Sequence, residues 1–239
     1  MRIKYVVSQI TKTALIIMIL AISSQANAAL LSFVNGGFEG YTGNTNTFNS
    51  AVPPGWTTTG KAPDTFDGNT NFANYTWGAS STGGDFLHGI GRQPALTESA
   101  QQLALDGLVI GQKYEISFEQ SISRCDYSQT GGFWRIFFGS ESHDSALMAI
   151  PDSGVFEGWD WMTMLFTATS TTQSLTVSAM SDTDELRADL GIDSFYIGDP
   201  GENPDPPDET PIPEPATMLL LGSGFVGLAG FRRKKNLKK

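Results

Sequence analysis

The feature that most constrains this chain is a strict alternation of apolar and polar residues. Residues 113–122 (KYEISFEQSI) place Tyr114, Ile116 and Phe118 on one side of an extended backbone, with acidic and serine side chains on the other. Successive side chains of a strand point to opposite faces, so this pattern predicts a strand with one buried face. Helical periodicity of useful length does not occur between residues 29 and 198.

Four more segments predict strands. They are 132–139 (GFWRIFFG), 162–168, 175–179 and 190–197 (LGIDSFYI). Several short strands separated by Gly-rich turns favour an all-β, antiparallel β-sandwich, most simply a jelly roll, over residues 29–198. Residues 40–84 have no clear period and are rich in Asn, so we expect long loops with short strands there.

The N-terminus is typical of a signal peptide, which we assign to residues 1–28. Arg2, Lys4 and Lys12 precede or flank an apolar run at 13–22. That run is too short to cross about 30 Å of hydrocarbon as a stable anchor, which argues against the alternative of a retained N-terminal helix. Small residues at 26 and 28 favour cleavage after Ala28.

Charge limits the partners of the exported part. The whole chain carries a net charge of −10, but residues 29–211 hold 24 Asp and Glu against 6 Lys and Arg, a difference of −18. Nucleic-acid binding needs clustered cations, so it is not expected. Divalent cations and neutral ligands are compatible with such a surface.

Cys125 is the single cysteine, so no internal disulfide can form and a hydrophobic core must hold the domain together. Cys125 itself fits either a pairing between chains or a small buried residue.

The C-terminal 41 residues change composition twice. Residues 199–211 are acidic and Pro-rich and predict an extended linker. Residues 212–239 (IPEPATMLLLGSGFVGLAGFRRKKNLKK) then begin with Pro213-Glu214-Pro215 and continue with an uncharged apolar stretch at 216–231, which predicts a single transmembrane helix. A cationic cluster follows and is expected to stay on the cytoplasmic side, which leaves the domain outside. It consists of Arg232, Arg233, Lys234 and Lys235.

This tail resembles the PEP-CTERM sorting signal of Gram-negative bacteria that make extracellular polysaccharide. The resemblance implies that Pro213, Glu214 and Pro215 are recognised by an exosortase-type processing enzyme. It implies an exported protein, first held in the cell-envelope membrane with its domain outside the cytoplasm, and then surface-bound or extracellular after processing. The alternative is a plain C-terminal anchor. Whether the mature form stays anchored or is released is left open.

Short motifs in the central region resemble the galactose-binding-like jelly roll of many carbohydrate-binding modules. They are Asn35-Gly36-Gly37-Phe38-Glu39, Pro54-Gly55-Trp56, Gly111-Gln112-Lys113-Tyr114, Phe166-Thr167-Ala168-Thr169 and Gly191-Ile192-Asp193-Ser194-Phe195. The resemblance implies a structural calcium ion held by Glu39 and Asp193, and oxygen ligands of this kind are what calcium prefers. The alternative is that both are ordinary acids at strand ends.

Sugar recognition needs flat aromatic faces beside polar groups. The candidates are Trp77, Trp134, Trp159, Trp161 and Tyr127. Trp159 and Trp161 share one side of their predicted strand and are the first pair to test. The alternative for each tryptophan is a role in the core.

Catalysis has no support in the sequence. His88 and His143 have no zinc-type spacing, and no serine lies in a nucleophile elbow. We therefore expect a non-catalytic surface or matrix protein that binds or organises extracellular polysaccharide. The alternative is a structural matrix protein that self-associates without a specific glycan ligand.

Overall fold

The computed structural model describes residues 31–204, except 72–73, 125–127 and 153. The chain divides into two compact units, the first ending at Asn203 and the second starting at Pro204. The predicted signal peptide, most of the predicted linker and the whole sorting tail lie outside the described residues. The described residues contain no helix that is long and apolar enough to cross a membrane.

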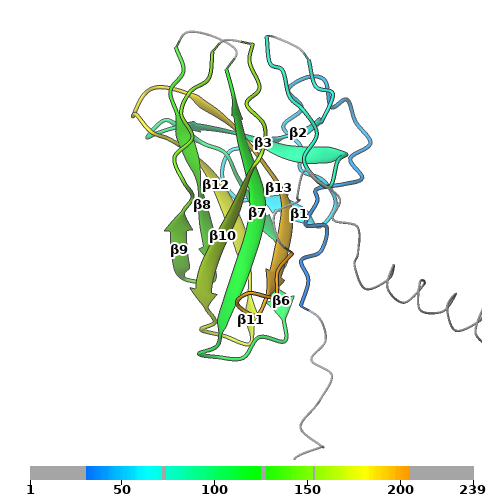
Figure 1. Cartoon of the computed structure of the whole chain (residues 1–239), viewed down its shortest axis with the longest axis vertical. Coiled ribbons are helices and arrows are strands. Elements are labelled where there is room, and N and C mark those ends of the chain that lie inside the picture. The colour runs from blue at the N-terminus through cyan, green and yellow to red at the C-terminus, as the bar shows by residue number, and fades with distance from the viewer. Residues whose placement is uncertain (1–30, 72–73, 125–127, 153, 205–239) are drawn as a thin grey trace, which may run out of the picture. The chain divides into compact units, whose positions relative to one another are not determined.

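The first unit is built from strands, most of which belong to two antiparallel sheets (Figure 1). The first sheet has the order β1 (Trp56–Thr58), β5 (Ser99–Gln102), β12 (Leu175–Ser181), β8 (Gly132–Phe138) and β9 (Glu141–Asp144). The second sheet has the order β10 (Asp160–Thr167), β7 (Lys113–Ser123), β13 (Ala188–Gly198), β3 (Asp85–Arg92) and β2 (Asp64–Asp67), with β4 (Leu96–Thr97) paired to β3. A separate pair is formed by β6 (Leu105–Asp106) and β11 (Thr172–Gln173).

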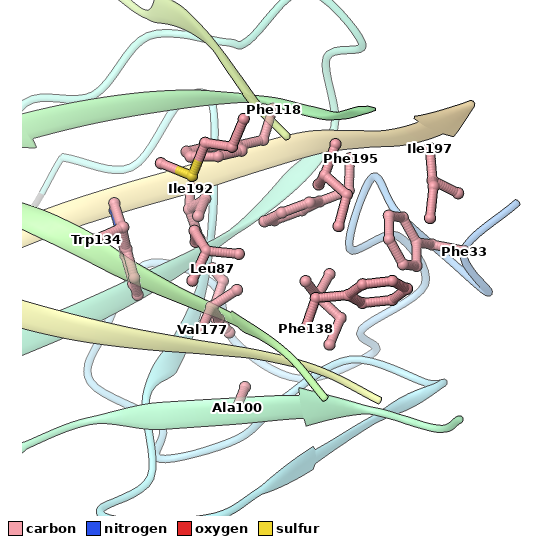
Figure 2. Close-up of a cluster of buried hydrophobic side chains, with 14 of the residues drawn as sticks. Phe33, Leu87, Ala100, Phe118, Trp134, Phe138, Val177, Ile192, Phe195 and Ile197 are labelled. Atoms are coloured by element: carbon pink, nitrogen blue, oxygen red, sulfur yellow. The ribbon is translucent and has the colours of Figure 1, made fainter. Parts of the chain in front are cut away.

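The large hydrophobic core lies between the two sheets (Figure 2). Leu87, Phe118 and Ile192 from the second sheet meet side chains of β8 and β12, among them Trp134 and Val177. Trp134 is fully buried and donates a hydrogen bond from its indole Nε1 to the Gly191 carbonyl at 2.9 Å, which joins the sheets through the core. The predicted all-β class and antiparallel sandwich are confirmed.

The predicted strands coincide with observed ones. Residues 113–122 lie in β7, 132–139 cover β8, 162–168 overlap β10, 175–179 lie in β12 and 190–197 lie in β13. The segment 40–84 contains two short strands, β1 and β2, as expected. The sequence did not predict β3, which is buried on both faces and therefore shows no alternation.

A second, smaller hydrophobic cluster covers part of the opposite face of the second sheet, which we call the outer face. Phe66, Tyr75, Trp77 and Phe86 form it, with Phe156 and Trp159 packed against them. These residues come from β2, β3 and the loops around residues 74–79 and 154–159, so they cover the β3 half of that face.

The first unit extends five residues beyond the boundary expected at residue 198. The Asn203 side-chain amide donates to the Glu115 carbonyl and to Ser117 Oγ, both at 2.9 Å. The Gly201 N–H also donates to the Glu115 carboxylate at 3.1 Å. Residues 199–203 therefore pack along β7, although their composition is that of a linker.

Candidate functional site on the outer face of the second sheet

The β7 and β10 half of the outer face carries two neighbouring aromatic rings. Trp161 of β10 lies opposite Glu119 of β7, and Tyr196 of β13 lies opposite Ser117 on the other side of β7. The Trp161 and Tyr196 rings reach toward each other above β7, with centroids 5.8 Å apart and planes inclined by 41°. Both side chains are half-buried, and Thr163 beside them is exposed. We call this pair the aromatic platform.

The other aromatic candidates have different surroundings. Trp134 lies in the main core with its ring enclosed. Trp77 is buried in the smaller cluster, where its indole Nε1 has no hydrogen-bond partner among the described residues. Trp159 packs on that cluster and donates to the Gly78 carbonyl at 2.9 Å. Tyr127 lies outside the described residues. Of the candidates that the structure describes, Trp161 is thus the one whose ring belongs to neither hydrophobic cluster.

A bulge in β13 brings buried oxygen atoms together next to the platform. The register shifts between Asp193 and Tyr196, and Ser194 takes a positive φ of 57°. This conformation turns Phe195 into the core and leaves Asp193 and Tyr196 on the outer face. Asp193 therefore faces Glu119, its register partner on β7.

We call Asp193, Glu119 and the hydroxyl groups around them the oxygen cluster. The Asp193 carboxylate accepts hydrogen bonds from Ser80 Oγ, from Thr82 Oγ1 at 3.3 Å and from the Ser194 N–H at 2.7 Å. Glu119 Oε2 accepts from Ser81 Oγ and Ser194 Oγ, each at 2.6 Å. Burial, together with the negative charge of Glu119, raises the pKa of Asp193 to about 8.

Glu39, the other predicted calcium ligand, lies near this cluster but shares no hydrogen bond with Asp193 among those that the structure describes. An added Cβ on Gly37 would lie 3.9 Å from Glu39 Cγ and 4.0 Å from Asp193 Oδ1, so the two acids flank this glycine. Glu39 accepts from the Asp85 N–H at 3.2 Å. The sequence analysis did not select Glu119 as a ligand. The strand register that places Glu119 beside Asp193 joins two distant segments and cannot be predicted from the residues around either one.

A second group of polar residues is buried under the loops that cover β3. His88 contacts Asp64 through Nδ1 at 3.2 Å and Asp189 through Nε2 at 3.1 Å. Burial opposes protonation, but hydrogen bonds and charges of Asp189 and Asp64 raise the pKa of His88 to about 9. Burial also raises the pKa of nearby Glu98 to about 7. We call Asp64, His88, Glu98, Asp189 and Arg187 the buried ion network.

The comparisons with known proteins add one clear result at the C-terminus. Residues 211–234 match the model of the PEP-CTERM protein-sorting motif, which confirms the sorting signal expected from the sequence. This motif indicates an exported protein that is anchored at the membrane by its C-terminus before exosortase processing. No curated protein sequence matches the chain.

The solved structures similar to this chain include carbohydrate-binding modules. TmCBM61 in complex with β-1,4-galactotriose has 13% identity and a TM-score of 0.41, and the match covers 72% of this chain and 99% of the module. The xylan-binding CBM22-1 domain of Paenibacillus barcinonensis Xyn10C has 16% identity and a TM-score of 0.43, covering 72% and 96%. The C-terminal family 22 module of Clostridium thermocellum Xyn10B has 18% identity and a TM-score of 0.43, covering 75% and 99%. At these scores the likeness does not identify a ligand.

Proposed function

We propose that this chain is an exported, exosortase-sorted surface or matrix protein whose β-sandwich binds extracellular polysaccharide without catalysis. The observation that carries the proposal is the aromatic platform of Trp161 and Tyr196 on the outer face of the second sheet. The sorting motif supports the location, because it indicates export of the domain.

The chemistry of the platform suits a sugar ring. Trp and Tyr rings offer flat apolar faces for the C–H groups of a sugar, and polar side chains at the rim can bond its hydroxyl groups. Thr163 is exposed beside the rings, and the Tyr196 phenol supplies a donor and an acceptor. The net charge of −18 over residues 29–211 disfavours acidic glycans. The ligand class that fits best is therefore a neutral polysaccharide.

A pull-down on insoluble and immobilised neutral polysaccharides tests this proposal. Trp161→Ala removes half of the platform, and we expect binding to weaken about tenfold, which corresponds to about 1.4 kcal/mol. Phe137→Ala is the matched control, because Phe137 is a half-buried aromatic residue of β8 in the first sheet. Binding that is lost in Phe137→Ala and kept in Trp161→Ala would contradict the platform. Self-association of the wild type without binding to any glycan would favour the structural matrix alternative.

We also propose a structural calcium ion at the oxygen cluster, with Asp193 as its main ligand. Calcium takes six to eight oxygen ligands, and carboxylate and hydroxyl oxygens are present here. Two carboxylates buried side by side are costly without a cation, which supports the fit. Glu119 lies opposite Asp193, and Glu39 is the candidate on the other side of Gly37.

Calcium removal provides the test for this cluster. At a calcium concentration about 100 times the Kd, binding stabilises the folded state by about 2.7 kcal/mol, so a chelator should lower the melting temperature of the wild type. Asp193→Asn should abolish that dependence, whereas Asp160→Asn, an exposed acid on β10, should keep it. Comparing Glu119→Gln with Glu39→Gln identifies the second ligand. A wild-type melting temperature that does not respond to chelator contradicts the site.

The role of the sorting motif is tested in the producing cell. Glu214→Ala alters the acidic residue of the tripeptide, and we expect the protein to remain unprocessed at the membrane with a larger mass. Immunoblots of membrane and extracellular fractions measure this change. Glu202→Ala, an acidic residue before the motif, is the control and should be processed normally.

A further inference from the structure

Three potential metal ligands converge beneath the loops on the β3 half of the outer face. His88 of β3 and Asp64 of β2 are register partners, and Glu98 lies between β4 and β5. One ligand atom from each of the three side chains lies within 4.8 Å of the other two. All three residues are buried, with exposed fractions of 0% for His88, 3% for Asp64 and 7% for Glu98. Because all three side chains are buried, the cluster is not a group of surface residues held apart from one another by water.

The His88 ring is held in the orientation that a metal ligand requires. Its Nε2 atom contacts Asp189 Oδ1 at 3.1 Å, and Asp189 is fully buried. Asp189 is in turn held by Tyr75 Oη at 2.6 Å and by Arg187 Nε at 2.7 Å. A histidine that donates one ring N–H to a carboxylate presents the lone pair of its other nitrogen, and metal-bound histidines are commonly held this way. Here the other nitrogen, Nδ1, faces Asp64 Oδ2 at 3.2 Å.

Formal charges in the buried ion network favour an added dication. The network holds three carboxylates, from Asp64, Glu98 and Asp189, whereas Arg187 supplies one permanent positive charge. With all three carboxyl groups ionised and His88 protonated, one negative charge among these five residues is left over, and an unpaired buried charge is costly. With His88 neutral and a dication between Nδ1, Asp64 and Glu98, Arg187 balances Asp189 and the dication balances the other two carboxylates. The sum is then zero.

We propose that His88 Nδ1, Asp64 and Glu98 bind one divalent transition-metal ion, for which Zn²⁺ is the reference. One imidazole and two carboxylates suit zinc, whereas calcium prefers oxygen ligands alone. Ligand atoms about 2.1 Å from a tetrahedral zinc lie about 3.4 Å apart, so small side-chain shifts within the observed 4.8 Å close the site. The site is enclosed, which is typical of structural metal ions. It would tie β2 and its loops to β3 and the β4–β5 connection.

The proposal is tested on the full-length chain in detergent after removal of metals with a chelator. Zn²⁺ alone is the probe, with bound metal measured by equilibrium dialysis and stability by thermal denaturation. Calcium binding at the oxygen cluster is kept constant by adding the same calcium concentration to every sample. We expect the wild type to bind one Zn²⁺ per chain and to melt at a higher temperature when Zn²⁺ is present.

The Glu98→Gln variant tests whether Glu98 is a metal ligand or an acid with a structural role alone. The amide oxygen still accepts the hydrogen bond that Glu98 Oε2 receives from the Ile90 N–H at 2.8 Å, but the charge is lost. We expect Zn²⁺ affinity to fall at least tenfold, while the metal-free variant melts at or above the temperature of the metal-free wild type, because an unpaired buried charge has been removed. Asp64→Asn is the second variant, and its Zn²⁺ affinity should fall similarly.

The matched control is His143→Gln. This variant removes an exposed histidine whose Nε2 atom lies 2.9 Å from a Glu141 carboxylate oxygen, so it also breaks a His–carboxylate pair. This variant should bind Zn²⁺ like the wild type. The proposal is overturned by a wild type that binds no Zn²⁺, by a Glu98→Gln variant that binds it as tightly as the wild type, or by loss of binding in His143→Gln.

Discussion

Gly191 shows how one residue joins the two hydrophobic clusters. It lies on the outer face of β13, where an added Cβ would be 2.8 Å from Trp77 Cζ3 and 3.0 Å from Trp159 Cη2. Its carbonyl accepts the indole hydrogen bond of Trp134 from the main core. Indole rings from both sides of the sheet thus contact this backbone position, and the two on the outer face leave no room for a side chain.

We expect Gly191→Ala to destabilise the protein by about 1–3 kcal/mol, because an extra methyl group in a packed site forces its neighbours to move. Urea denaturation followed by tryptophan fluorescence measures the change. Gly37→Ala is the control, since an added Cβ there meets its nearest neighbour, Thr82 Oγ1, at an ordinary 3.7 Å. Equal stability of the Gly191→Ala variant and the wild type would mean that the two rings do not close on this glycine.

The sequence predicts some individual residues of the candidate site and misses others for a physical reason. Trp161 can be recognised from the sequence because it alternates with Met162 and Met164, whose side chains point to the opposite face of the strand and pack in or against the main core. Trp134 is not distinguishable in advance, because the segment GFWRIFFG is apolar on both faces and either face fits a core. Glu119 alternates like a solvent-facing acid, but its pairing with Asp193, 74 positions later, and the hydrogen bonds from Ser81 and Ser194 place it in a buried cluster.

At the scale of elements, the edge strand β2 depends on a side chain rather than on a neighbouring strand. The Asn49 amide donates from Nδ2 to the Thr65 carbonyl at 2.7 Å and accepts from the Thr65 N–H at 3.0 Å. These two bonds reproduce the pairing that another strand would provide. They also cover an edge that otherwise exposes unpaired backbone groups. Thr65 is fully buried, so its backbone has no water to replace Asn49.

Asn49→Ala should therefore lower the free energy of unfolding by about 1–3 kcal/mol, because it leaves a buried donor and a buried acceptor without partners. Thermal denaturation measures the loss. Asn69→Ala is the matched control, because Asn69 is an exposed loop asparagine whose backbone N–H, rather than its side chain, bonds Asp67 at 2.7 Å. A loss of the same size in both variants would show that loop asparagines in general, and not the capping of β2, carry the effect.

Element prediction from this sequence succeeds where one face of a strand is buried and the other is polar. β7 follows residues 113–122 closely for that reason. β3 (DFLHGIGR) is sandwiched between the main core and the smaller cluster, so its side chains on both faces are buried and the two-residue period disappears. The covering loops around residues 74–79 and 154–159 lie outside β3 in the sequence, so no pattern within β3 predicts them.

At the scale of the whole molecule, the chain combines a folded unit that ends at Asn203 with a sorting motif matched at residues 211–234. The sandwich carries its own cores, and the matched motif begins at residue 211. The position at which the folded unit ends determines how many residues lie between this unit and the sorting motif. The hydrogen bonds of Gly201 and Asn203 to β7 place that end at Asn203.

Two shortened chains test this boundary. A chain that ends after Asn203 should unfold at the same urea concentration as the intact protein, because all described hydrogen bonds of the sandwich are kept. A chain that ends after Gly198 loses three bonds to Glu115 and Ser117, and its free energy of unfolding should fall by about 1–3 kcal/mol. Asn203→Ala in the longer chain should reproduce most of this loss, which excludes an effect of length alone. If both shortened chains match the intact protein, residues 199–203 belong to the linker, as composition alone predicts.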